Sequence, residues 1–379
     1  MYMNCEIEFL PVGDGSKAGD AIVVRYGSDQ QYELMVIDGG SKESGEQVVG
    51  HIRSHFGPFA HVSHAVLTHC DADHASGMRE ILQGLNVGCL WMLVPWWSAV
   101  EARPYFKDKR WTSEGLQTAI RREYDIIDDL ISIARRRGVP IESPFAGKYI
   151  GPFYTLSPHK PFYEALISQF DRTPEPDQAA IEALGFWIGK QPNALQRLYD
   201  RALAKAQTWM TESWDDEWLR NDGVTSATNE SSVVLYGSAI NAGRILLTGD
   251  AGQRALGHAA WQAGQVGLPL QQFSFVQVPH HGSRRNVGPA ILDALLGPKQ
   301  MTGSPPRFTA FVSAPKDDAT HPRQMVINAF LRRGAGLGGR PAVAATQGVP
   351  IVYWGGFAPR PTYVGVVGIG FGERVENYD

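Results

Sequence analysis

Residues 65–77 read AVLTHCDADHASG, and the interpretation of the fold depends on this stretch. An apolar run leads into His69, Asp71, Asp73 and His74, and a glycine follows them. In an extended chain alternate side chains point the same way, so the first three can converge, and a turn after them can bring in the second histidine. Because such crowding of carboxylates and imidazoles costs repulsion and desolvation without a cation, the stretch predicts a divalent metal site. The alternative is an exposed polar loop.

Further short runs of Val, Ile, Leu and Phe also end at polar residues. ELMVIDGG ends near Asp38, RILLTGD ends at Asp250, and FSFVQVPHHGS ends at His280 and His281. Such runs indicate buried strands, and polar residues at strand ends gather into sites in layered α/β folds. Helical patterns fall between the runs, at about 45–55, 76–84, 251–264, 288–296 and 322–333. This alternation of strands and helices predicts an α/β fold.

The composition is that of a water-soluble globular protein. The chain has 379 residues and a formal net charge of −4, which argues against a global basic field that would attract nucleic acid but leaves room for a local basic patch. Three cysteines favour a reducing compartment over a disulfide framework. No signal peptide is evident, and no apolar run approaches the roughly 20 residues that cross a bilayer. We therefore expect a cytoplasmic enzyme that does not act on a membrane.

In the segment 98–226 the alternation of predicted strands and helices is interrupted. AIRREYDIIDDLISIARRRG has helical spacing and a stop at Gly138, a short return to strands is expected near 139–158, and 161–222 reads as helical and rich in Trp. We predict the two halves of a core at 1–97 and 227–379, with a mostly helical insertion between them. The insertion could bind nucleic acid through its basic run at Arg135–Arg137, or a protein partner. The alternative is a cap whose tryptophans pack its own core.

Together these motifs resemble the metallo-β-lactamase superfamily. THCDADHASG matches its H-x-[HD]-x-D-H signature, and with LLTGD and HHGS it looks like the soluble hydrolase domain of the ComEC competence-protein family. EFLPVGDGSKAGDAIVV, NESSVVLYGSAINAGRILLTGD and FVSAPKDDATHP resemble further segments of that family. The resemblance covers roughly 1–95, 138–160 and 227–335. It implies a four-layer αββα sandwich of the metallo-β-lactamase type with a metal site at the sheet edges.

By position, the resemblance also implies two divalent metal ions. Their ligands would be His69 and Asp71 on the first ion, Asp73, His74 and a histidine of the 280–281 pair on the second, and Asp250 between them. We expect His280 to be the ligand of that pair because it lies nearer the strand end. His281 would then contact metal or substrate as a catalytic residue.

Other residues would support the site. Asp38 resembles a buried aspartate that orders the ligand loop, and Asn229 stands where the superfamily commonly has a histidine. Asp71 also replaces a histidine of the commoner pattern. Because both changes exchange nitrogen for oxygen, we expect Mn²⁺ to be favoured, with Zn²⁺ or Mg²⁺ as alternatives.

The predicted reaction is hydrolysis of a phosphodiester in DNA, RNA or a nucleotide by a hydroxide that the two metal ions hold. Asp73 could orient this nucleophile. His321 or Ser283 could hold a phosphate oxygen, and Arg284 and Arg285 follow directly after the HHGS motif, where guanidinium groups suit phosphate. The alternatives are a hydrolase of a small ester, lactone or thioester, and a binding scaffold with a vestigial metal site.

Overall fold

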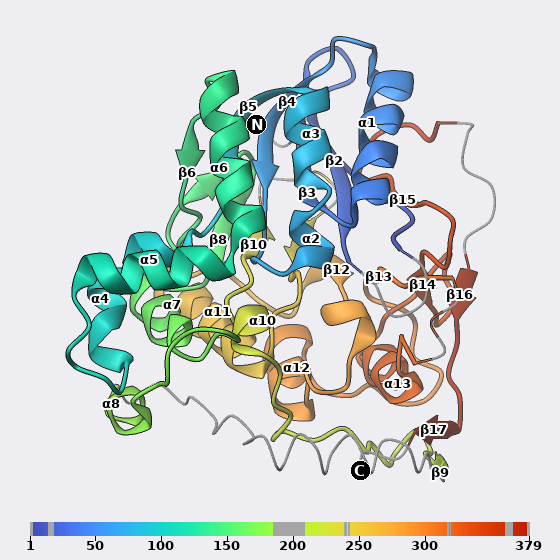
Figure 1. Ribbon diagram of the computed structural model, residues 1–379. Coiled ribbons are helices and arrows are strands. Elements are labelled where there is room, and N and C mark those ends of the chain that lie inside the picture. The colour runs from blue at the N-terminus through green and yellow to red at the C-terminus, as the bar shows by residue number, and fades with distance from the viewer. Residues whose placement is uncertain are drawn as a thin grey trace.

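Two β-sheets lie face to face at the centre of the molecule, and helices cover their outer faces (Figure 1). The computed structural model describes residues 3–13, 19–184, 209–238, 241, 243–316, 318, 320–360 and 367–376. Within these residues no helix combines the length and the apolar composition needed to cross a membrane.

The first sheet has the strand order β15-β1-β2-β3-β4-β5-β6. Its antiparallel part comprises β15 (Ile351–Tyr353), β1 (Asn4–Phe9), β2 (Ala21–Gly27) and β3 (Tyr32–Gly39). From β3 onward the pairing is parallel, through β4 (His61–Val66), β5 (Asn86–Trp91) and β6 (Ile141–Glu142). The carboxyl ends of β3 and β4 therefore lie at the same edge, where Asp38 and the 65–77 stretch emerge.

The second sheet has the order β16-β14-β13-β12-β11-β10-β8-β7. Its parallel centre comprises β11 (Arg244–Leu247), β12 (Phe273–Gln277), β13 (Thr309–Val312) and β14 (Val343–Ala345). The antiparallel flanks are β7 (Tyr149–Ile150), β8 (Phe153–Ser157) and β10 (Val234–Gly237) on one side and β16 (Val367–Ile369) on the other. Asp250 follows β11, and the histidine pair follows β12, so both emerge at one edge of this sheet.

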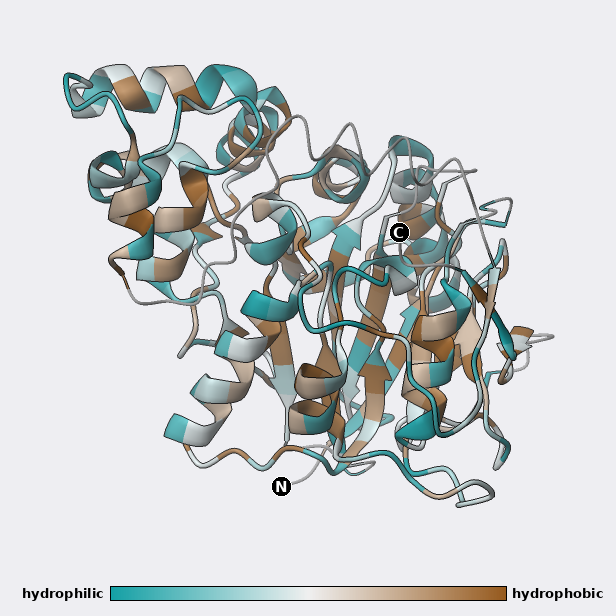
Figure 2. Ribbon diagram, turned by 90° about the horizontal axis from the view of Figure 1, so that it is seen from below, coloured by the Kyte–Doolittle hydropathy of each residue, from teal (hydrophilic) through white to brown (hydrophobic). Residues whose placement is uncertain are grey.

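Apolar side chains of both sheets form the layer between them. Alternation along β1 turns Ile7 and Phe9 into this layer, where the ring of Phe9 contacts Phe275 and Phe311 of the second sheet at centroid distances of 6.1 and 5.7 Å. Figure 2 shows these central strands largely in brown and the surrounding helices banded in brown and teal. The pattern is that of strands buried on both faces between amphipathic helices.

Two sets of helices form the outer layers. On the first sheet lie α1 (Lys42–Phe56), α2 (Ala72–Ala75) and α3 (Met78–Gly84), and on the second lie α11 (Gln253–Gln265), α12 (Pro289–Leu296) and α13 (Gln324–Arg332). α1 begins after Ser41, whose hydroxyl accepts a hydrogen bond from the backbone N–H of Ser44. The expected four-layer α/β sandwich is thereby confirmed.

The helices of the segment 98–226 gather at one side of the sandwich, at the left of Figure 1. They follow η1 (Pro95–Ser98) and comprise α4 (Ala99–Ala102), η2 (Arg103–Tyr105), α5 (Ser113–Glu123), α6 (Asp125–Arg137), α7 (Lys160–Ile167) and α8 (Gln178–Glu182). Tyr124 separates α5 from α6 with a non-helical backbone (φ −124°, ψ 56°), and α6 ends at Gly138 in the left-handed conformation, where the stop was predicted.

Two parts of this segment differ from a helical insertion. The return to strands near 139–158 joins both sheets, because β6 extends the first and β7 and β8 extend the second. The prediction of helix for 161–222 is wrong beyond α8 within the described residues: Trp209–Thr211 forms the strand β9, which pairs with β17 (Arg374–Glu376), and 212–224 contains no helix. Trp187 and its surroundings lie outside the described residues. The structure around β9 depends on its long-range pairing with β17, and no local sequence pattern predicts this pairing.

Candidate metal centre

The predicted ligands come from both sheets and meet at one edge of the sandwich. His69 and Asp71 lie in the loop after β4, and Asp73 and His74 lie in the short helix α2. From the second sheet, Asp250 follows β11, and the two histidines lie in η3 (His280–Gly282) after β12. We call this set of seven residues the metal centre. The parallel pairing of β3 with β4 and of β11 with β12 brings these strand ends together.

Each buried histidine of the metal centre uses Nδ1 for a structural contact. Nδ1 of His69 lies 3.0 Å from Thr68 Oγ1, Nδ1 of His74 lies 2.8 Å from Asp38 Oδ2, and Nδ1 of His281 lies 3.2 Å from the Ser313 carbonyl oxygen. A proton on Nδ1 satisfies each of these contacts, and the lone pair is then left on Nε2. The three rings are therefore held in the tautomer that can bind a metal through Nε2.

The Nε2 atoms converge on the carboxylate of Asp250. Their distances to its Oδ2 are 3.4 Å for His74, 3.6 Å for His280, 3.6 Å for His281 and 3.9 Å for His69. In the described part of the chain, Asp250 Oδ1 and the Nε2 atoms of the three buried histidines have no hydrogen-bond partner. Buried polar atoms are rarely left unsatisfied, and a divalent cation would satisfy all four atoms together.

The ligand atoms form overlapping groups within 4.8 Å of one another. These groups are His69, His74 and Asp250; Asp73, His74 and His281; and Asp250, His280 and His281. Asp71 stands at the edge, with Oδ2 3.6 Å from His69 Nε2 and accepting a hydrogen bond from Thr228 Oγ1 at 3.0 Å. Both histidines of the pair thus reach Asp250, and His281 is the one grouped with Asp73 and His74.

Asp38 lies completely buried behind the ligands. Its Oδ1 accepts a hydrogen bond from the Thr68 backbone N–H at 2.7 Å, and its Oδ2 accepts from Thr68 Oγ1 at 2.6 Å and from His74 Nδ1 at 2.8 Å. One carboxylate thereby fixes the loop before His69 and the ring of His74. Its backbone is left-handed (φ 56°), as are those of His280 (φ 47°) and His281 (φ 54°). Non-glycine residues seldom adopt this region, and they concentrate at functional sites.

Close backbone contacts hold the ligand loop in place. A Cβ added to Gly19 would lie 1.9 Å from the carbonyl oxygen of Asp73, and one added to Gly77 would lie 2.0 Å from that of Gly39. Only glycine allows these approaches, so any side chain at either position would displace the loop that carries Asp73 and His74.

Asp20 and Gln277 belong to the site but were missed in the sequence. Gln277 Nε2 donates to Asp20 Oδ2 at 2.7 Å, and Gln277 Oε1 accepts from the backbone N–H groups of Thr248 and Gly249 at 2.9 and 3.1 Å. This chain of hydrogen bonds fixes the turn before Asp250. Burial raises the pKa of Asp20 to about 6. In the sequence, the pair Gly19-Asp20 directly before the apolar run of β2 could have marked Asp20 as a site residue.

The electrostatic field of the metal centre is strongly negative around His74. Burial alone would lower the pKa of His74, but the charges of Asp250 and Asp38 raise it well above its ordinary value. For Asp250 burial acts to raise the pKa, and the neighbouring imidazoles His74, His280 and His281 hold it well below its usual range. Burial lowers the pKa of His281 to about 3, so its imidazole is neutral and its lone pair available. Such a field suits a divalent cation.

A cavity of about 420 Å³ opens beside the metal centre. The predicted substrate residues Ser283, Arg284, Arg285 and His321 line it together with Asn229 and His280. Arg323, which the sequence analysis missed, lines it as well. Nδ1 of His321 lies 3.0 Å from Asp318 Oδ2, which orients the ring, and burial lowers the pKa of His321.

His280 is held from the cavity side. Asn229 Nδ2 donates to Thr225 Oγ1 at 2.8 Å and lies 3.1 Å from His280 Nδ1, which also lies 2.8 Å from Asn286 Oδ1. These amides fix the ring of His280 so that Nε2 faces Asp250. Asn286 was not identified in the sequence, because nothing near it marks it as a partner of the histidine pair.

No protein-family model matches the chain, and no curated protein matches it. Solved structures with a similar fold include the subclass B3 metallo-β-lactamase MEM-A1 from a soil metagenome library (14% identity, 76% of this chain, 85% of that chain, TM-score 0.31). They also include the metallo-β-lactamase SMB-1 (10%, 76%, 86%, 0.30) and the dizinc quorum-quenching lactonase AidC (11%, 68%, 72%, 0.29). At these values the likeness concerns the fold alone. The sheets and helices described above make this chain a four-layer α/β sandwich.

Proposed function

We propose that this protein is a metal-dependent hydrolase whose substrate is a phosphodiester in a nucleic acid or nucleotide. The observation that carries the proposal is the convergence of four imidazole Nε2 atoms on Asp250 beside a cavity lined by arginines. Buried atoms without partners call for a cation, and guanidinium groups suit an anionic substrate.

Two divalent ions would be held by the residues of the metal centre. His69 and Asp71 would bind one ion, Asp73, His74 and His281 would bind the other, and Asp250 would lie between them. His280, which the sequence suggested for the second ion, reaches Asp250 from the side of Asn229 and would complete the first. The donors are then imidazole nitrogens mixed with carboxylate oxygens, which suits Mn²⁺ or Zn²⁺ better than Mg²⁺. In hydrolases, bound ions of this kind polarise a phosphoryl oxygen and make water more acidic.

The cavity wall would bind and orient the substrate. Arg284 and Arg285 line it from the turn after η3 and Arg323 from the loop before α13, so a phosphate could meet guanidinium groups from two segments of the chain. Ser283 offers a hydroxyl on the same wall. A guanidinium donates two parallel hydrogen bonds to a phosphate, which fixes orientation as well as position.

Asp73 and His321 would act on protons and oxygens of the reacting groups. Burial raises the pKa of Asp73, and this carboxylate lies in the group with His74 and His281, where it could orient an attacking water. Because burial lowers the pKa of His321, its ring is neutral near pH 7. With Nδ1–H held by Asp318, its Nε2 would be left to accept a hydrogen bond from substrate or water.

Metal content and substrate class test this proposal directly. Protein purified without chelator should contain close to two divalent ions per chain, and it should cleave bis(p-nitrophenyl) phosphate and single-stranded DNA or RNA when Mn²⁺ or Zn²⁺ is supplied. Cleavage of p-nitrophenyl acetate or of a lactone without phosphodiester cleavage would instead support the ester hydrolase. Protein that binds no metal and hydrolyses nothing would be a scaffold, and the proposal would be rejected.

A further inference from the structure

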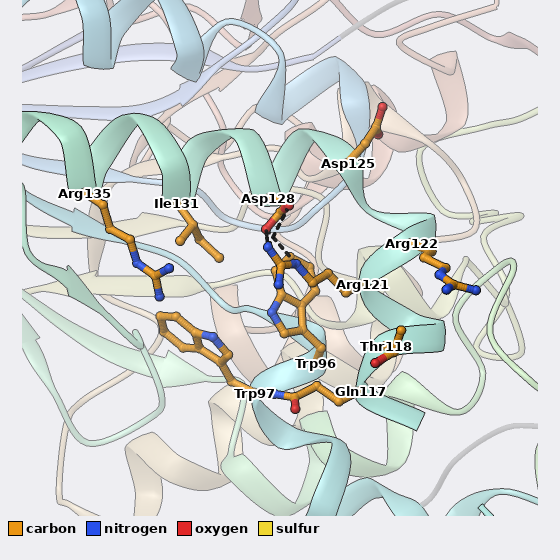
Figure 3. Close-up of a pocket in the computed structure, with 10 residues that line it drawn as sticks. All are labelled: Trp96, Trp97, Gln117, Thr118, Arg121, Arg122, Asp125, Asp128, Ile131 and Arg135. Carbon is orange, nitrogen blue, oxygen red and sulfur yellow. Dashed lines mark hydrogen bonds and ion pairs between the residues drawn. The ribbon is translucent and has the colours of Figure 1, made fainter. Parts of the chain in front are cut away.

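A second cavity, which we call the helical pocket, lies between η1, α5 and α6 (Figure 3). Its volume is about 470 Å³, and its walls include Trp97, Arg121, Asp128, Ile131 and Arg135. Figure 3 shows Trp97, Arg121 and Arg135 directed into the same hollow, whereas Asp125 is turned away from it. The pocket thus combines an aromatic surface with guanidinium groups.

Two adjacent tryptophans have different roles here. Trp96 is 4% exposed and belongs to the main hydrophobic core, whereas Trp97 is 41% exposed. An exposed indole at a concave surface offers a face on which an aromatic ring can stack. Trp96 therefore packs within the core, whereas Trp97 presents its indole at the surface of the pocket.

The arginines of the pocket also divide into two kinds. Arg121 is bound to Asp128 through two hydrogen bonds, Nε to Oδ1 at 2.8 Å and Nη2 to Oδ2 at 3.0 Å, so its charge is balanced. Within the residues that the structure describes, Arg135 forms no hydrogen bond or ion pair. Arg137, in the same basic run, instead donates to the carbonyl oxygens of Gln83 and Leu85 at 2.9 and 3.1 Å. Arg122 also lines the pocket, and in the described part of the chain neither it nor Arg135 forms an ion pair, so the positive charge that Asp128 does not balance belongs to these two arginines.

The helical pocket and the metal centre are structurally connected. α6 contacts α2, which carries Asp73 and His74. Tyr124, at the junction of α5 and α6, donates its hydroxyl to the carbonyl oxygen of Asp171, and Asp171 lines the cavity beside His280. From Asp125 to Arg135 the helix rises by about 15 Å. This length corresponds to roughly four or five stacked nucleotides at about 3.4 Å each.

From this arrangement we infer that the helical pocket is an accessory subsite for a single-stranded nucleic acid whose scissile phosphate lies at the metal centre. One base stacks on Trp97, and a neighbouring phosphate pairs with Arg135. The inference rests on the proposed function, since it takes the same strand to be the substrate. Stacking and backbone charge together give binding that tolerates any sequence, which distinguishes this subsite from a site that reads base edges.

Binding of a fluorescently labelled oligothymidylate of about 20 nucleotides to the full-length protein, measured by anisotropy with chelator present to prevent cleavage, tests the inference. Trp97→Ala should weaken binding about tenfold through lost stacking. Arg135→Gln should weaken it too and should reduce the slope of log K against log salt by about 0.7, the contribution of one phosphate contact on a single strand.

Arg136→Gln and Trp261→Ala are matched controls, because Arg136 neighbours Arg135 without lining the pocket and Trp261 is an exposed tryptophan on α11. Both controls should bind within about twofold of the unaltered protein, on the ground that isolated surface changes have small effects.

Hydrolysis of bis(p-nitrophenyl) phosphate separates this inference from the proposed function. Trp97→Ala and Arg135→Gln should cleave this small substrate at the unaltered rate. If the protein cleaves it and both variants bind the oligonucleotide as tightly as the unaltered protein, the subsite is rejected and the proposed function stands. If the protein cleaves no phosphodiester while oligonucleotide binding still depends on Trp97, the proposed function fails and the pocket remains a nucleic-acid site. If AMP binds as tightly as the oligonucleotide with the same dependence on Trp97, the pocket holds a free nucleotide, and the inference is overturned.

Discussion

The metal centre and the helical pocket lie in the same molecule but are built in opposite ways. In the metal centre the histidines are held by partners behind them, such as Asp38 and Ser313, and the ligands are largely buried. In the helical pocket the side chains are mostly exposed, and the ion pair between Arg121 and Asp128 holds these two side chains in place. The first arrangement fixes reacting groups before substrate arrives, whereas the second can adapt to different bases. Changes in the metal centre should therefore alter the rate, and changes in the pocket should alter affinity.

Backbone strain separates the two regions as well. Asp38, His280 and His281 are left-handed, and each costs on the order of 1–3 kcal/mol that surrounding contacts must offset. The pocket residues on α5 and α6 lie in regular helix. Of the two regions, only the metal centre contains strained residues. Its geometry is therefore maintained by the surrounding contacts, although the backbone alone would favour other conformations.

The largest effect is expected from Asp250→Asn. This change keeps the shape of the side chain but removes the charge on which four imidazoles converge. Metal content and hydrolysis should both fall by more than about 100-fold, which is the upper limit of the loss seen when a residue that only contacts a metal ligand is changed. Metal analysis and the phosphodiester assay measure it. Asp129→Asn, an exposed surface change, serves as control. Full activity in folded Asp250→Asn protein would remove the distinction between the two regions.

Metal binding should also stabilise the fold. At a free Mn²⁺ or Zn²⁺ concentration about 100 times the Kd, the free energy of unfolding should rise by about 2.7 kcal/mol for each ion bound, which corresponds to a Tm increase of roughly 3 °C per ion for a chain of this size. Thermal unfolding with and without metal measures the shift. Asp250→Asn should show little of it, and an equal shift in that variant would mean that the ion binds elsewhere.

The histidine pair offers a finer test. His281→Ala should lose the ion shared with Asp73 and His74 and reduce hydrolysis more than His280→Ala does, because only His281 is grouped with those two ligands. Metal stoichiometry and kcat distinguish the variants. A larger loss in His280→Ala would restore the assignment expected from the sequence.

Asp38→Asn tests the support behind the ligands. Asparagine tolerates the left-handed backbone, so the change removes charge without adding strain. We expect metal affinity to fall by about 10- to 100-fold, as for other partners of metal-binding histidines. Titration with metal under competition by a chelator of known affinity measures the change. Unaltered affinity would show that the loop is ordered by its glycines alone.

The smallest effects are expected in the helical pocket. Because their side chains are exposed, Trp97→Ala and Arg135→Gln should leave the free energy of unfolding within about 0.5 kcal/mol of the unaltered protein. Denaturant unfolding measures this value. A loss of several kcal/mol would make the pocket a part of the structural core and remove the contrast with the metal centre.

Much of the fold could be predicted because its signals are local. Apolar runs marked β3, β4, β11 and β12, and the spacing of polar residues marked where those strands end. Since strand ends in a parallel sheet gather at one edge, the candidate ligands could be brought together without knowing the register. The left-handed turn at Gly138 was also visible, because glycine after a basic helical run is a local stop signal.

The remainder depends on contacts between distant parts of the chain. The pairing of β9 with β17, the role of Gln277 toward Asp20, and the use of Arg137 by the Gln83 and Leu85 carbonyls cannot be read from neighbouring residues. The same is true of the histidine pair. Two consecutive left-handed residues turn both rings toward Asp250, whereas an extended strand end would have turned them to opposite sides.

The origin of the ligands in both sheets has a consequence for folding. His69, Asp71, Asp73 and His74 belong to the first sheet, and Asp250, His280 and His281 belong to the second, so no ion can be fully coordinated until the sheets have docked. Bound metal then links two parts of the chain that are far apart in sequence, and because the ion is held only when the sheets are docked, its binding free energy stabilises the native state. Metal availability would thus govern the lifetime of the native state as well as its chemistry, and unfolding should be slowed when the metal centre is filled.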